Sequence, residues 1–179
     1  MADTDYKLKI YIKQSEDDKR NIFVYTFRFP TTYDFYEEMQ NNFKLQKSFD
    51  TNIEHYDCKE IIDENTKVIY LAYKKMLIVQ PRDFVYVRYT FKEDENSYWS
   101  IATSIPDEQL FQGTVRGSII LTATRIVQEG DEINISVYSQ VDMKMGIKQT
   151  VARTRGLTEI KKYLDRCYEH IQKERSNIL

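Results

Sequence analysis

One segment of this sequence places a positive charge among aromatic side chains. Residues 82–92 read as a β-strand with apolar or aromatic groups on both faces, because successive side chains of a strand point to opposite sides. One face carries Val85, Val87, Tyr89 and Phe91, and the other carries Phe84, Tyr86, Arg88 and Thr90. Burying a charge without a partner is expensive. The pattern therefore predicts that an anionic or strongly hydrogen-bonding group meets Arg88.

The sequence around this strand also predicts mostly β-structure. Alternating apolar and polar residues predict strands at 6–13 and 22–29, and further strands near 56–62, 67–75, 97–105, 115–127 and 132–142. Thr31 or Thr32 is expected to cap a short helix over 33–39, and residues 128–131 to form a tight hairpin. With 179 residues, only 5 Gly and 3 Pro, the chain offers little linker material, so we expect a single domain over 1–179.

The last expected element is a long helix from Gly146 to Lys173. Apolar and small side chains recur along it at helical spacing and share one stripe: Ile147, Val151, Thr154, Leu157, Leu164, Tyr168 and Ile171. Gly156 lies inside this helix and is expected to bend or divide it. Taken alone, such a stripe indicates core more often than the wall of a ligand site, because apolar periodicity reports burial and nothing more.

The charge balance argues against nucleic acid as a partner. Lys+Arg 26 against Asp+Glu 28 gives a net charge of −2, so no global basic field is present. The two cysteines, Cys58 and Cys167, exclude a disulfide framework and suit a reducing compartment. The first residues carry no secretory or transit pattern, and no apolar run is long enough to span a membrane. We therefore expect a cytoplasmic protein.

The sequence offers little for catalysis or for metal binding. It has two histidines and no Gly-x-Ser-x-Gly elbow, phosphate-binding glycine loop or His-Glu-x-x-His helix, so we expect no catalytic residues and no cofactor. His55 and Cys58, together with Cys167 and His170, supply a possible Cys2His2 zinc set. Such short spacings recur by chance, and the two halves lie far apart in the chain. We therefore expect no metal site and interpret Cys167 as a small buried hydrophobe.

Four motifs, in order along the chain, resemble those of the START lipid-transfer domains. They are Phe49-Asp50-Thr51-Asn52, the strand from Arg82 to Arg88, Val115-Arg116-Gly117, and the run from Gln140 to Gly146 before the last helix. The resemblance is best over residues 65–172. It implies an α+β helix-grip fold, in which a curved antiparallel sheet wraps around a long C-terminal α-helix and leaves a lipid tunnel between them.

The resemblance also implies a function and a set of contacts. A START-like domain would bind one lipid, to carry or to sense it without changing it, and would touch membranes transiently. The helical stripe then becomes a tunnel wall, and Arg88 meets a lipid phosphate or, in sterol-like binders, an acid near a hydroxyl or ketone. The expected ligand-binding residues are Phe84, Tyr86, Arg88, Val151, Thr154 and Leu157. The alternative is a structural arginine bonded to backbone carbonyl groups.

Three departures from the family pattern shape these expectations. The strand over 68–73 supplies no carboxylate, so a phosphate partner for Arg88, and hence a phospholipid, is favoured over a sterol. Gly146 is followed by Ile147-Lys148 where the family usually has a proline. The chain begins almost at its first strand, without the family's N-terminal helix. The outer face would then need another cover, from a further segment, a protein partner or a second copy, at Val85, Val87, Tyr89 and Phe91.

Two other classes of function stay open. The same fold could serve as an interaction or structural subunit of a larger assembly, with its tunnel filled or collapsed. A hydrolase or cyclase on a related fold is the third class, and it lacks an evident nucleophile and base.

Overall fold

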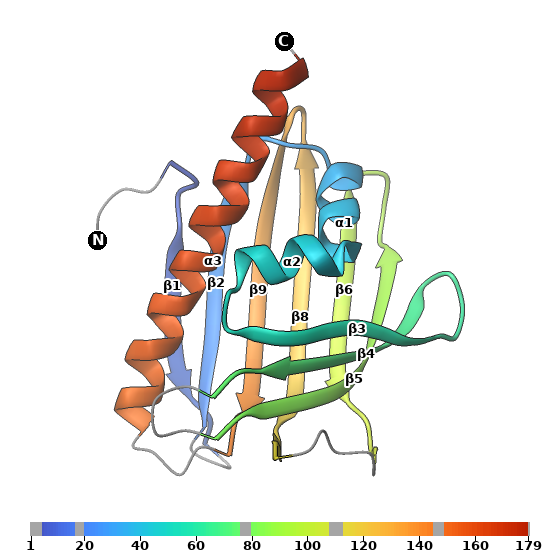
Figure 1. Ribbon diagram of the computed structural model, residues 1–179. Helices are drawn as coiled ribbons and strands as arrows, with labels where there is room; N and C mark the ends of the chain where they lie inside the picture. Colours follow the sequence, from blue (N-terminus) through green and yellow to red (C-terminus); the bar gives the residue numbers. More distant parts are fainter. Residues whose placement is uncertain (1–4, 17–19, 76–79, 108–112, 145–148, 179) are drawn as a thin grey trace.

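The computed structural model describes residues 5–16, 20–75, 80–107, 113–144 and 149–178 (Figure 1). Within these ranges the chain forms nine strands and three helices. The strands are β1 (Lys9–Gln14), β2 (Asn21–Phe29), β3 (Ile53–Ile61), β4 (Thr66–Tyr73), β5 (Arg82–Lys92), β6 (Ser97–Ser104), β7 (Val115–Arg116), β8 (Ser118–Glu129) and β9 (Glu132–Asp142). The helices are α1 (Tyr33–Asn41), α2 (Phe43–Phe49) and α3 (Gln149–Ile178).

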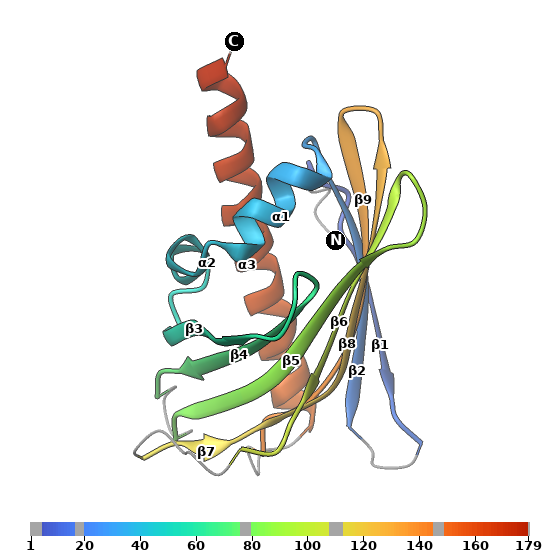
Figure 2. The same ribbon diagram turned by 90° about the vertical axis from the view of Figure 1, so that its right-hand side faces the viewer.

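The strands build one curved sheet in the order β1-β2-β9-β8-β6-β5-β4-β3, and β7 pairs with β5. Neighbours along this order are antiparallel, whereas the short β5–β7 pair is parallel. Because β1 and β3 lie at the two ends of the order, the sheet is not closed into a barrel. Figure 2 shows all three helices on the same side of this sheet. The predicted α+β helix-grip architecture is therefore confirmed.

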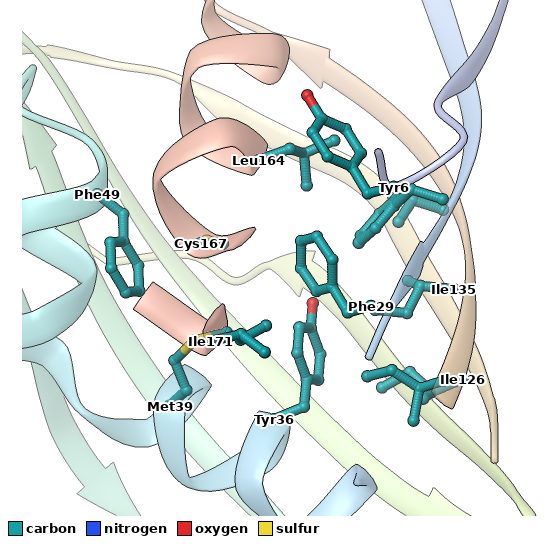
Figure 3. Close-up of a cluster of buried hydrophobic side chains, with 13 residues drawn as sticks. Tyr6, Phe29, Tyr36, Met39, Phe49, Ile126, Ile135, Leu164, Cys167 and Ile171 are labelled. Carbon is teal, nitrogen blue, oxygen red and sulfur yellow. The ribbon is translucent and has the colours of Figure 1, made fainter. Parts of the chain in front are cut away.

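The C-terminal half of α3 belongs to the hydrophobic core. Leu164, Cys167 and Ile171 are fully buried there. They pack among side chains of the central strands and of α1, including Phe29 and Ile135 (Figure 3). In this half of the helix the apolar stripe faces the hydrophobic core. The position of Cys167 fits its interpretation as a small buried hydrophobe.

Two short helices precede β3, and the sequence predicted only the first of them. Thr32 caps α1 by accepting a hydrogen bond from the Phe35 N–H group at 3.4 Å. Asn42 ends α1 and caps α2, since its side chain accepts from the Leu45 N–H group at 3.0 Å. A cap residue satisfies the free N–H groups of a first helical turn, so one asparagine separates two helices and turns the chain.

The family-like motifs mostly build the frame that joins β5 to β7 and β9. Asp83 is fully buried and pairs with Arg116 on β7 through two contacts of 3.0 and 3.1 Å. Gly117 lies against the Phe84 ring so closely that an added Cβ atom would come within 2.3 Å of it. Arg82 donates to the backbone carbonyls of Met143 at 2.5 Å and Lys144 at 3.0 Å, which fastens the end of β9 to the start of β5. These residues fix the positions of three strands.

Several element boundaries differ from the sequence-based prediction. Lys7 adopts a left-handed backbone conformation (φ 51°), so the first strand starts at Lys9 instead of residue 6. Tyr6 turns inward and donates a hydrogen bond to Asp165 on α3 at 2.6 Å. Helix α3 begins at Gln149 in the described part of the chain and runs on to Ile178, and Gly156 does not divide it. The predicted start at Gly146 lies outside the described residues.

The outer face of β5 changes character along the strand. Val85 is fully buried within the chain, whereas Tyr89 is 44% exposed. Tyr89 stacks on Phe91, and Phe91 stacks on Trp99 of β6, with ring centroids 5.5 and 6.5 Å apart. The start of this face is therefore covered by the chain itself, and its far end presents a row of aromatic rings.

Candidate functional site

A cavity of about 650 Å³ lies between the concave face of the sheet and α3. This volume falls within the range of roughly 300 to 1,000 Å³ that is usual for small-ligand sites. Its described lining comes mainly from β2 (Phe23, Tyr25), β4 (Leu71, Tyr73), β5 (Phe84), β9 (Ser139, Val141) and α3 (Arg155, Gly156, Glu159, Ile160, Tyr163). Aromatic and aliphatic side chains share this lining with many polar and charged ones, as suits an amphiphilic molecule.

Hydrogen bonds close the side of the cavity between α3 and the two short helices. Tyr163 donates to the Gln46 side chain at 2.7 Å and accepts from Gln40 at 3.1 Å. Asn52 donates to Glu159 at 2.8 Å, and Arg166 donates to the Phe49 carbonyl at 2.5 Å. These contacts follow one side of α3, so that wall is polar and its groups are already satisfied by the protein.

Asp50 follows α2 and lines the same cavity. One of its carboxyl oxygens accepts hydrogen bonds from Asn52, at 3.0 Å from the backbone and 3.1 Å from the side chain. Burial raises the pKa of Asp50 from its ordinary value, and the two hydrogen bonds oppose that change without cancelling it. The group is therefore a carboxyl that loses its proton less readily than an exposed aspartate.

Two tyrosine hydroxyl groups reach the cavity without a partner from the protein. Among the described residues, neither Tyr25 on β2 nor Tyr73 on β4 makes a hydrogen bond through its hydroxyl group, and both line the cavity. Burial raises the pKa of Tyr25 to about 12 and the pKa of Tyr73 still further, so both stay protonated at neutral pH. Nearby, Tyr86 donates to the Tyr56 hydroxyl group at 3.3 Å.

Cationic side chains gather at one end of the cavity. Arg20, Lys144 and Arg155 all contribute to its lining, and Arg20 pairs with Asp142 at 3.0 Å. Within the described ranges Arg155 makes no ion pair or hydrogen bond through its side chain, although it stands on the cavity wall of α3. This end therefore carries a positive group that is available to an anion.

Arg88 lies in a second, smaller cavity of about 200 Å³. The two cavities share the wall residues Gln40, Tyr56 and Ile119, so they adjoin. The Arg88 guanidinium donates to the side-chain oxygen of Asn41 at the end of α1, and Lys67 donates to the same oxygen at 3.1 Å. The strongly hydrogen-bonding group that the sequence led us to expect at Arg88 is thus an amide from another element.

The other expected contact residues are distributed unevenly. Phe84 lines the large cavity, and Tyr86 lines the small one together with Arg88. Thr154 and Leu157 are not among the described lining residues of either cavity, and Thr154 is exposed. The side chain of Val151 lies outside the described part of the structure. The structure therefore brings Phe84, Tyr86 and Arg88 together along one strand. The described cavity lining from α3 consists of residues other than the expected ones.

Sequence reasoning missed most of the polar lining. The alternation of Phe23, Tyr25 and Phe27 places all three on one face of β2, and this signal could have identified Tyr25. Tyr73 ends β4, and the sequence-based interpretation of this strand considered only that it supplies no carboxylate for Arg88. Nothing in the sequence marks Arg155 as lining a cavity, because that depends on how α3 lies across the sheet.

The possible zinc ligands do not form a cluster. Cys167 lies in the core, His170 packs between the rings of Phe35 and Phe49, and the Cys58 thiol contacts the Glu60 carbonyl. No group of three or more His, Cys, Asp or Glu side chains in the described ranges is placed to hold a metal ion. Among the same residues, no helix combines the length and the apolar character that crossing a membrane requires.

Comparisons with known proteins agree on one family. The model of the START domain family matches residues 24–176. Human StAR-related lipid transfer protein 5 superposes with a TM-score of 0.82 at 15% identity, covering 98% of this chain and 86% of that one. Human STARD10 gives 0.78 at 16% identity, with 96% and 73% covered. A STAR-related lipid transfer protein from Xanthomonas axonopodis gives 0.78 at 16% identity, with 96% and 97% covered. No curated protein matches the sequence.

Proposed function

Because the chain belongs to the START domain family, whose members generally bind lipids, we propose that it holds one lipid non-covalently in the cavity beneath α3. The observation that carries this proposal is the cavity of about 650 Å³, whose walls combine aromatic and aliphatic side chains with polar and charged groups. The protein would carry or sense the lipid without changing it, as a single domain over 1–179. It would act in the cytoplasm and touch membranes transiently to load and release the lipid.

The finer proposal is a phospholipid, preferred over a sterol, with its phosphate at Arg88. A guanidinium carries five N–H donors, and the Asn41 side-chain oxygen is the one acceptor that Arg88 has among the described residues. Arg88 lines the smaller cavity, which adjoins the large one. A lipid with its chains in the large cavity could therefore bring a phosphate to Arg88, where the hydrogen bonds would be charge-assisted.

Phe84 and Tyr86 would contact the same lipid from β5, where they precede Arg88 on the concave face. Val151, Thr154 and Leu157 of α3 stay in the proposal as contacts made by the first turns of the helix. Of the set, Phe84 has the most direct support, because its ring lines the large cavity.

Replacing Arg88 tests the phosphate contact. Arg88→Met keeps most of the apolar stem and removes the charge. A charge-assisted hydrogen bond contributes about 1.5 to 3 kcal/mol, so phospholipid affinity should fall roughly 10- to 100-fold. Sterol affinity should change little. The measurement is a titration of the folded, delipidated variant with a fluorescent phosphatidylcholine and with a fluorescent sterol.

Lys67→Met is a matched control for this experiment. Lys67 donates to the same Asn41 oxygen as Arg88 but lines neither cavity among the described residues, so this change should leave both affinities close to wild type. Equal losses for both lipids in Arg88→Met would identify a structural arginine. Unchanged phospholipid binding would remove the phosphate role, and a loss found in Arg155→Met instead would move the headgroup to the cationic end of the cavity.

A second candidate function is an interaction or structural module within a larger assembly. The aromatic row of Tyr89, Phe91 and Trp99 favours it, because a partly exposed apolar patch is a common docking surface and could bind a protein partner or a second copy. Mass spectrometry of lipids that copurify with the protein, combined with light scattering, separates the two functions. Bound lipid on a monomer supports lipid binding, whereas an empty cavity in an oligomer supports the assembly.

A further inference from the structure

The hydroxyl groups of Tyr25 and Tyr73 are the least explained polar groups of the large cavity. Each belongs to a half-buried side chain on the cavity wall between the sheet and α3, and neither hydroxyl bonds to another described residue. A hydroxyl group that lines a cavity and makes no bond to the protein can bond to water or to a ligand in that cavity. Two such hydroxyls in one cavity therefore offer hydrogen bonds to a ligand that fills it.

The two tyrosines come from opposite parts of the sheet. Tyr25 lies on β2, near one end of the strand order, and Tyr73 lies on β4, near the other end. The curvature of the sheet brings them to the same space, since Tyr25, Tyr56 and Asp50 all lie close enough to Tyr73 to influence its ionisation. A group between β2 and β4 is thus within reach of hydroxyls from both walls.

The surroundings of Tyr73 favour an uncharged ligand group. Asp50 is its strongest electrostatic neighbour, so an anion placed there would be repelled by the carboxylate whenever Asp50 is ionised. The hydroxyl groups themselves are neutral, and a hydroxyl can both donate and accept. An oxygen without charge can accept from both tyrosines and avoids this repulsion.

We infer that Tyr25 and Tyr73 form a hydrogen-bonding subsite for an uncharged oxygen of the bound lipid, either a hydroxyl group or an ester carbonyl. The inference rests on the proposed lipid binding. It concerns an uncharged oxygen of the lipid, whereas Arg88 is proposed to bind the phosphate. The subsite and Arg88 are compatible with one lipid. The Tyr86–Tyr56 hydrogen bond joins the two cavities, because Tyr86 lines the small one and Tyr56 lines both.

The test compares three fluorescent probes on the double variant Tyr25→Phe/Tyr73→Phe and on each single variant. Dehydroergosterol carries one hydroxyl group, a polyene-labelled phosphatidylcholine carries ester carbonyls, and diphenylhexatriene carries no oxygen. Each lost neutral hydrogen bond should weaken binding roughly 2- to 12-fold, and both together roughly 5- to 100-fold. Binding of diphenylhexatriene should stay within about 2-fold of wild type, because no hydrogen bond is lost.

The folded state gives an independent check on these variants. Since neither hydroxyl bonds to a described residue, the Tyr→Phe changes should leave the midpoint of thermal unfolding unchanged or slightly higher. Tyr138→Phe is the matched control, because Tyr138 alternates with the cavity residues Ser139 and Val141 of β9 and so points to the other face of the sheet. It should alter none of the three affinities.

The outcomes divide clearly. A selective loss for the sterol supports the subsite with a hydroxyl as its source, and a selective loss for the phospholipid supports it with an ester carbonyl. Equal losses for all three probes, or no loss for either oxygen-bearing probe, would overturn the subsite while leaving lipid binding in place. If the wild-type protein bound none of the probes, the proposed function would fail, and the subsite with it.

Discussion

At the scale of single residues, the polar groups of the two cavities differ in how many hydrogen bonds they make to the rest of the protein. Tyr163 has two partners, Arg88 has one, and the hydroxyl groups of Tyr25 and Tyr73 have none among the described residues. A group with all its hydrogen bonds made holds the structure together, whereas a group with bonds to spare can recognise a ligand. The number of hydrogen bonds that a polar group makes within the protein therefore separates residues that hold the cavity wall together from residues that can bind a ligand.

Asp50 leads to a prediction about the pH dependence of stability. Its pKa in the unfolded chain is near the ordinary value of 3.8, and burial raises it in the folded protein. The stability gained from this raised pKa is present below the unfolded value and is lost as pH rises through the folded pKa. Asp50→Asn removes the titration and keeps a side-chain oxygen for Asn52. Relative to this variant, the wild-type free energy of unfolding should fall with rising pH, by about 1.4 kcal/mol for every pH unit that separates the folded pKa from the unfolded one.

Urea unfolding of both proteins at a series of pH values measures this difference. Asp63 provides a control of opposite sign, because hydrogen bonds from Asn65 and Thr66 lower its pKa. Its contribution should be present above the unfolded value and be lost as pH falls. Parallel stability curves for wild type and Asp50→Asn would show that Asp50 ionises alike in both states.

The sequence could predict residues whose role follows from one strand, and it could not predict partners from elsewhere. Period-two alternation predicted that Phe84, Tyr86 and Arg88 share one face of β5. It could not identify Asn41, which reaches Arg88 from the end of α1, 47 positions away. The cavity role of Tyr25 and Tyr73 likewise depends on curvature that a single strand does not encode.

At the scale of elements, α3 combines two kinds of helix. Its second half buries Leu164, Cys167 and Ile171 in the core, while its first half presents Arg155, Gly156 and Glu159 to the cavity. The apolar spacing predicted a helix correctly but gave no sign of this division, because a stripe facing a cavity and a stripe facing the core have the same period. Helix α2 was missed, since its seven residues are too short for a reliable period.

Gly156 tests the balance between stability and function in α3. Glycine inside a helix costs roughly 0.5 to 1 kcal/mol relative to alanine. A Cβ atom at this position would come within 2.9 Å of the tip of the Phe23 ring, which lines the cavity and can tilt into it. We therefore expect Gly156→Ala to raise the free energy of unfolding by up to about 1 kcal/mol and to weaken lipid binding.

Chemical denaturation and lipid titration of the same preparation measure both effects. Thr158→Ala, at an exposed position of the same helix, changes propensity without touching the cavity lining and should leave lipid affinity unchanged. A drop in both stability and affinity in Gly156→Ala would mean that the Phe23 ring cannot move and that the helix itself shifts.

At the scale of the whole molecule, four residues of the motifs that the sequence shares with the START family hold the strands of the frame together. Arg82, Asp83, Arg116 and Gly117 bind strands together, and none of them lines either cavity among the described residues. The fold could therefore be predicted from these motifs. The ligand could not, because the cavity walls combine motif residues, such as Asp50 and Phe84, with residues outside the motifs, such as Tyr25 and Arg155.

Ligand binding should appear in the stability of the entire domain. A lipid that binds only the folded protein raises the free energy of unfolding by about 2.7 kcal/mol at a free concentration 100 times its dissociation constant. We expect the midpoint of thermal unfolding to rise with phospholipid concentration, and to rise less in Arg88→Met. If the midpoint followed protein concentration and ignored lipid, the assembly function would be favoured.

The pairing of β2 with β9 has a consequence for how the chain acquires its structure. Residues 22–29 align with residues 133–140, so the sheet joins segments that lie far apart in the sequence. Contacts so distant in sequence slow folding, because the loop between them must close before they contribute. Until β9 emerges from the ribosome, β1 and β2 can pair only with each other, and the aromatic face of Phe23, Tyr25 and Phe27 has no sheet to join. The nascent chain thus carries this apolar hairpin while the residues between β2 and β9 are made, before the pocket can exist.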